Sequence, residues 1–61
     1  MKVSELVKIL KRNGCIFVKH GKEHDVYHSS ITNKNIRIPR HKSQEIPTGT
    51  ARKILKDAGL N

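Results

Sequence analysis

Apolar side chains are scarce in this chain, which narrows the folds that can bury them. Only 34% of its 61 residues are hydrophobic, and the aromatic residues are just Phe17 and Tyr27. A chain this short buries only about 60% of the surface that its unfolded form exposes. The core must therefore be thin. We expect function on an open face or in a shallow groove, without a deep pocket that encloses an organic cofactor.

The apolar residues recur at helical spacing near both ends of the chain. Residues 4–13 predict a helix with Ser4 as its N-cap and Asn13-Gly14 as its stop. Residues 47–58 predict a second helix that Gly59 ends. The buried stripes expected are Leu6, Val7, Ile9 and Leu10 in the first helix, and Ala51, Ile54, Leu55 and Ala58 in the second.

Three short segments between the helices have strand character. Residues 15–19 are β-branched and aromatic, while 24–29 and 35–39 alternate along the chain, with His24, Val26 and His28 on one face of the middle segment. Polar turns separate the three segments, and residues 40–46 are expected as a polar connection. The pattern predicts an α+β fold in the order α-β-β-β-α, as a single domain over residues 1–61. Two helices would cover one face of a three-stranded antiparallel sheet and leave the other face open.

The net charge indicates the kind of partner. Thirteen Lys and Arg against five Asp and Glu give +8 and a pI near 10.2, which favours a polyanion such as RNA. The lone Cys15 excludes an internal disulfide bond and is expected to be buried. No segment has the length of a transmembrane helix or the pattern of a signal peptide, so we expect a cytoplasmic protein without a membrane partner.

His24 is the candidate for proton transfer. It lies between the glycine turn at Gly21 and the second strand, and Glu23 or Asp25 beside it could orient it. RNA carries its own nucleophile, the 2′-OH, so cleavage needs mainly a base, an acid and stabilisation of the phosphate charge. The alternative is that His24 is an exposed strand residue with no function in catalysis. The cations expected to hold phosphate are Lys19, Lys22, Arg37 and Arg40, together with His41.

The spacing of His20, His24 and His28 raises the question of a metal site. On a helix, these three residues would share one face and could bind zinc. Gly21 and the β-type residues after His24 favour a turn and a strand instead, which would separate His24 and His28 by about 13 Å. We therefore expect no metal.

An ordered set of motifs resembles the HicA family of small toxins, the mRNA interferases of HicBA toxin–antitoxin modules. The set comprises Asn13-Gly14-Cys15, Gly21 with His24-Asp25-Val26-Tyr27, the run from Ile36 to His41, and the closing segment from Pro47 to Leu60. The family motif is commonly Gly-Ser-His with an aromatic or apolar residue shortly after it. Lys22 and Glu23 replace its small residues here, and Cys15 stands where a larger aromatic is usual.

The resemblance implies a double-stranded-RNA-binding-domain-like fold and metal-independent cleavage of mRNA that relies on one histidine, assigned to His24. It also implies inhibition of translation and growth, and neutralisation by a HicB-type antitoxin. Two other functions remain open from the residues alone. One is a non-catalytic RNA-binding module, and the other is a protein-interaction domain for an acidic partner.

Overall fold

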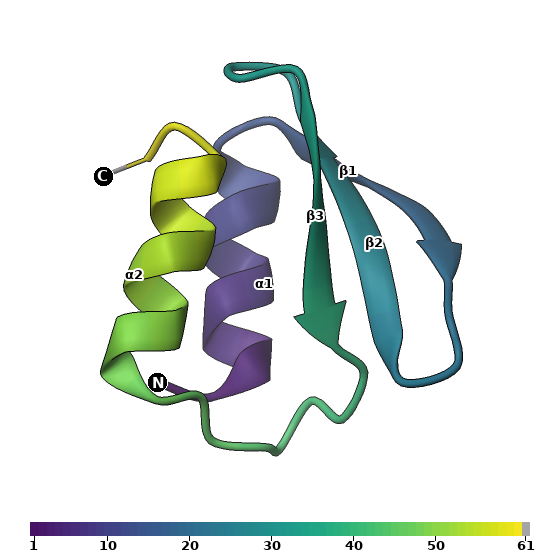
Figure 1. The fold of residues 1–61 in the computed structure, drawn as a ribbon, viewed down its shortest axis with the longest axis vertical. Coiled ribbons are helices and arrows are strands. Elements are labelled where there is room, and N and C mark those ends of the chain that lie inside the picture. Colours follow the sequence, from purple (N-terminus) through teal and green to yellow (C-terminus); the bar gives the residue numbers. More distant parts are fainter. Residues whose placement is uncertain (61) are drawn as a thin grey trace.

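The computed structural model describes residues 1–60 and contains five elements in the predicted order. They are α1 (Val3–Arg12), β1 (Cys15–His20), β2 (His24–Ser29), β3 (Lys34–Pro39) and α2 (Thr48–Asp57) (Figure 1). The predicted α-β-β-β-α order is therefore confirmed. The bounds of β2 agree with the prediction, and β1 and β3 are each one residue longer than predicted.

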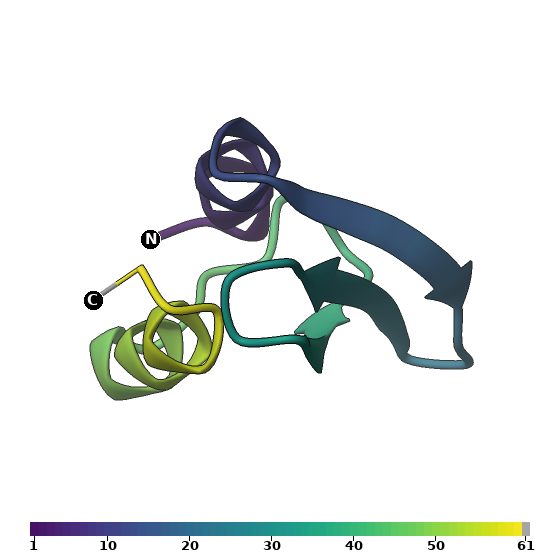
Figure 2. The same ribbon diagram turned by 90° about the horizontal axis from the view of Figure 1, so that it is seen from above.

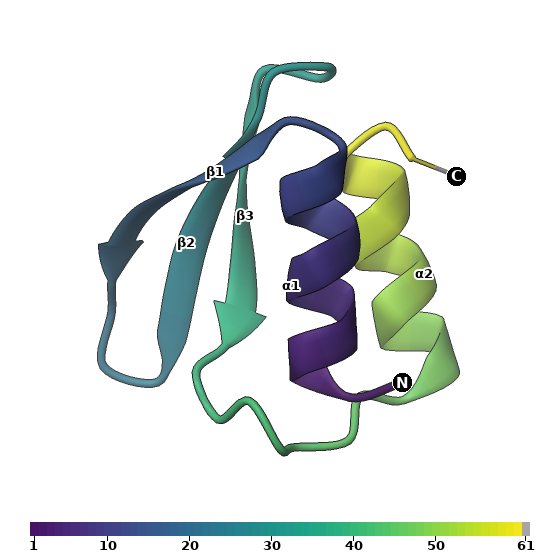
Figure 3. The ribbon, with the colours of Figure 1, turned by 180° about the vertical axis from the view of Figure 1, so that it is seen from behind.

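The strands form one antiparallel sheet in the order β1-β2-β3. Both helices pack on the same side of it and run side by side in the same direction, α1 nearer β1 and α2 nearer β3 (Figures 2 and 3). This two-layer arrangement confirms the predicted fold class. The opposite side of the sheet, called the open face below, is left uncovered by any element of residues 1–60.

The alternation of β2 decides what faces the helices and what faces solvent. Asp25, Tyr27 and Ser29 are buried beneath the helices, whereas His24 is exposed and Val26 and His28 are only partly covered. On β3, Ile36 and Ile38 are buried and Arg37 is exposed. Because paired residues of adjacent strands share a face, the register places the outward side chains of all three strands on the open face.

The predicted N-cap of the first helix is wrong. The helix begins one residue earlier, and the backbone N–H groups of Val3 and Ser4 donate to the carbonyls of Gln44 (2.9 Å) and Lys42 (3.0 Å). These contacts satisfy the N–H groups of the first two residues of the helix without a side-chain cap. The same packing buries Ile46, within the segment predicted to be a polar connection, and it leaves Ile9 only partly buried.

The β1–β2 turn is held by close backbone contacts that place His24. The Gly21 N–H donates to the His24 carbonyl at 2.6 Å, and a Cβ on Gly21 would lie 2.7 Å from that oxygen. From the end of β3, the Arg40 Nη1 donates to the carbonyls of Gly21 (3.0 Å) and Lys22 (3.2 Å). Gly21 is thus required by close approach, since its φ is not in the left-handed region.

A test of the core is Ile38→Ala, because Ile38 is 0% exposed in the layer between sheet and helices. We expect the free energy of unfolding to fall by about 2–5 kcal/mol from lost burial and the cavity left behind, measured by urea denaturation. Ile16→Ala is the matched control: Ile16 is 62% exposed, so a change below about 1 kcal/mol is expected. Equal losses in both variants would contradict the assignment of the buried face.

A test of the turn compares two Gly→Ala changes. Gly21→Ala should destabilise the protein by more than about 1 kcal/mol, because the new methyl group collides with the His24 carbonyl. Gly49→Ala, in α2 with open space around it, should instead be neutral or stabilise by about 0.4–1 kcal/mol. The measurement is the urea midpoint of each variant. A neutral Gly21→Ala variant would show that the turn does not hold the close contact.

Candidate functional site

The open face consists of side chains in cross-strand rows. One row contains Ile16, His28 and Asn35, from β1, β2 and β3 respectively. The next contains Lys19, Val26 and Arg37, after a bulge in β1 at Val18. The last contains His24 and Pro39. The face therefore presents a row in which His28 lies between an isoleucine and an asparagine, a row with a cation at each side, and a row with His24 beside a proline.

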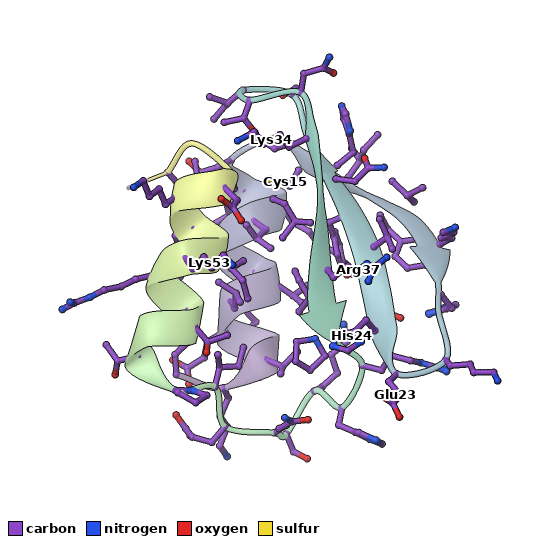
Figure 4. All side chains as sticks on the ribbon, viewed as in Figure 1. Cys15, Glu23, His24, Lys34, Arg37 and Lys53 are labelled. Carbon is purple, nitrogen blue, oxygen red and sulfur yellow. The ribbon has the colours of Figure 1, made fainter. Side chains whose placement is uncertain are left out.

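His24 lies where the hollows of this surface meet. Its side chain is exposed at the start of β2, close to the end of β3 (Figure 4). Three shallow hollows include it among their lining residues: one toward the segment that follows β3, one toward the β1–β2 turn, and one between β3 and α2. A ligand in any of these hollows would contact the imidazole.

The hollows bring together cations that are distant in the sequence. The first hollow is lined by Lys22, Glu23, His24, Pro39, Arg40, His41 and Gln44. The second is lined by Lys19, Gly21, Lys22, Glu23, His24, Val26 and Arg37. Each of the five residues predicted to hold phosphate thus shares a hollow with His24. The antiparallel register causes this, because it sets the β1–β2 turn beside the end of β3.

The third hollow adds a residue that the sequence analysis did not single out. It is lined on the sheet side by His24, Asn35, Ile36, Arg37 and Pro39, and on the α2 side by Thr50, Lys53, Ile54 and Asp57. Lys53 is an exposed residue of α2. Its helical position indicates exposure, but its place beside His24 and Arg37 depends on how α2 packs along β3 (Figure 4).

Arg40 and Asp25 have different surroundings from those the sequence suggested. Asp25 does not orient His24, because its carboxylate faces the helix side and lies 2.7 Å from Nδ1 of His20 and 3.7 Å from Nε of Arg40. Arg40 is 44% exposed in its side chain but uses Nη1 to bind the turn. Its first role in this structure is to position the turn that carries Lys22.

The three histidines at four-residue spacing do not gather. His20 contacts Asp25 on the helix side, while His24 and His28 lie at opposite ends of β2 on the open face. Within residues 1–60, no three His, Cys, Asp or Glu side chains are grouped so that they could hold a metal ion. None of the helices in the described part of the chain is long and apolar enough to cross a membrane. Cys15 is a buried free thiol.

Comparison with known proteins identifies the family. Searches of curated proteins and of solved structures gave no match. Among protein-family models, residues 3–60 match the family described as the HicA toxin of bacterial toxin–antitoxin systems. The match spans both helices and the whole sheet, including His24 and every cation around it. The chain therefore belongs to the HicA toxin family.

Proposed function

We propose that this protein is an endoribonuclease that cleaves mRNA without a metal ion, with His24 in proton transfer. The observation that carries the proposal is the position of His24, an exposed imidazole shared by three hollows whose walls supply cations from both edge strands of the sheet and from α2. Membership of a toxin family agrees with an activity that stops growth. Cleavage of mRNA in the cytoplasm would do so by blocking translation.

RNA cleavage of this kind requires from the protein mainly proton transfer and stabilisation of the negative charge on the phosphate. The substrate 2′-OH attacks the neighbouring phosphorus, and the bond from phosphorus to the 5′ oxygen breaks. His24 removes the proton from the 2′-OH or donates one to the leaving oxygen. His41 lines the first hollow together with His24, so it is a candidate for the second proton transfer. A single well-placed imidazole gives a slow enzyme, which suffices when the target is cellular mRNA.

The cations hold the backbone and stabilise the charge that develops on the phosphate. Lys19 and Arg37 flank Val26 in the row next to His24, and Lys22 and Lys53 border the hollows on either side. Such contacts with phosphate oxygens supply affinity without sequence information. Arg40 also adds positive charge to the first hollow, although its Nη1 is bound to the Gly21 and Lys22 carbonyls of the turn.

The toxin–antitoxin family implies a partner that neutralises this surface. We propose a HicB-type antitoxin that covers His24 and the cations around it. A protein that competes with RNA for a surface of this charge must present acidic side chains to it, because like charges oppose association and opposite charges accelerate it. An acidic antitoxin surface is therefore part of the proposal.

The first experiment replaces His24 with Ala and follows cleavage of a mixed mRNA substrate. We expect the rate to fall about 10²–10⁴-fold through loss of proton transfer. RNA binding and the urea midpoint should change little, because the side chain is exposed. The His41→Ala variant, measured in parallel, shows whether the His41 imidazole contributes to the cleavage rate. Lys8→Ala on α1 is the control, since Lys8 lines none of the three hollows. A His24→Ala protein that cleaves at the wild-type rate would remove His24 from the catalytic step, and a folded wild-type protein that cleaves no RNA would leave the non-catalytic RNA-binding module as the function.

The second experiment measures the salt dependence of RNA binding with His24→Ala protein. The slope of log affinity against log salt should be steep, and Arg37→Ala should reduce it by about 0.7, the contribution of one phosphate contact to a single strand. The affinity should fall by a similar factor for RNAs of different sequence. A shallow slope that Arg37→Ala leaves unchanged would favour a protein partner as the ligand of this face.

A further inference from the structure

The row of Ile16, His28 and Asn35 on the open face has no part in the mechanism above. We propose that Ile16, His28 and Asn35, with Asn33 from the β2–β3 loop, form a nucleobase subsite that selects guanine and uracil, which carry a carbonyl group at C6 or C4, over adenine and cytosine, which carry an amino group there. The inference rests on the proposed function, since it makes this row the part of the face that reads the RNA sequence.

The row is continuous across the sheet. His28 is paired with Ile16 on β1 and with Asn35 on β3, so the three side chains lie next to one another on the open face. Ile16 is 62% exposed, although it is a large apolar residue at a strand position. An apolar side chain beside an imidazole suits the flat face of a base, because unpaired RNA bases are bound by stacking on rings that include histidine.

The His28 ring is fixed by amides on both of its edges. Nδ1 lies 2.8 Å from Oδ1 of Asn35, and Nε2 lies 3.1 Å from Oδ1 of Asn33. Asn33 is held in the loop with φ of 57°, a left-handed conformation that asparagine tolerates better than most residues. The ring is therefore oriented before any ligand arrives, which lowers the cost of binding a base.

The hydrogen-bonding pattern of this cluster determines the base preference. A neutral imidazole has one N–H, which donates to one amide oxygen, while its other nitrogen accepts from the NH₂ of the second amide. An imidazolium donates to both oxygens. In each case at least one asparagine keeps its NH₂ group free beside the ring. A free N–H donor directed at the C6 or C4 substituent of the base favours the carbonyl of guanine or uracil and disfavours the amino group that adenine or cytosine carries at that position.

The position of the row suits a base near the cleaved bond. His28 lies four residues from His24 on the same face of β2, about 13 Å away along the strand, with the row of Lys19 and Arg37 between them. An RNA strand that runs along β2 would place one phosphate at His24, a neighbouring phosphate at the two cations, and a base at His28, a few nucleotides from the cut.

The experiment maps cleavage sites in a random-sequence RNA pool by sequencing the products. The wild-type protein should show guanine or uracil enriched at one position a few nucleotides from the cut. Asn35→Ala and His28→Ala should each reduce that enrichment by about fivefold or more, the discrimination expected of one direct base contact. Lys34→Ala is the control: it removes a charge from the same hairpin outside the row, so the sequence profile should not change.

Two results would overturn the subsite. One is a wild-type profile that is flat or enriched in adenine or cytosine. The other is a profile that Asn35→Ala and His28→Ala leave intact, which would show that the cluster only stabilises the hairpin.

A second measurement separates this inference from the proposed function. Short fluorescent RNAs that differ in one base are titrated against His24→Ala protein, which needs no catalysis. Tighter binding of the guanine or uracil RNAs that is lost in the double variant His24→Ala, Asn35→Ala supports the subsite, even where the wild-type protein fails to cleave RNA. Equal affinities for all four RNAs overturn it, and a wild-type protein that still cleaves keeps its proposed activity.

Discussion

The two-sided alternation of β2 is the constraint on which the rest of this structure depends. As the central strand, β2 is paired along both edges, so its side chains can only face the helices or the solvent. Its helix side contributes Tyr27 and Ser29 to the interior, and Ser29 donates through Oγ to the Ala58 carbonyl at 2.7 Å. Its other side contributes His24 and His28 to the open face. A shift of one residue in register would bury both histidines and expose the core.

The thin core and the charged face are connected through the β1–β2 turn. A net charge of +8 on a small domain places cations near one another, and their mutual repulsion works against the compact state. Arg40 limits this effect, because its guanidinium binds two turn carbonyls and lies near the buried carboxylate of Asp25. The same contacts set Lys22 beside His24. Stability and the placement of the candidate site thus rest on shared interactions.

Local sequence signals predicted much of the fold, and the errors have identifiable causes. The apolar stripes and the alternation of 24–29 and 35–39 report directly on periodicity, so the elements and the shared face of His24, Val26 and His28 followed from them. The N-cap did not follow, because carbonyls of the distant Gln44 and Lys42 accept from the first two N–H groups of the helix, which begins at Val3. The burial of Ile46 was also missed, because a single apolar residue in a polar segment produces no hydrophobic periodicity that would indicate a buried face. Each error arises where a distant segment competes with a local preference.

The sequence by itself determined the element order, the basic character, the candidate histidine and its neighbouring cations. These properties depend on residue type and on spacing along the chain. Only the tertiary structure decided which groups meet. It placed Lys53 in a hollow with His24, turned Asp25 away toward His20, and aligned Ile16, His28 and Asn35 in one row. The reason is physical: strand register and helix packing set distances between residues that no local pattern connects.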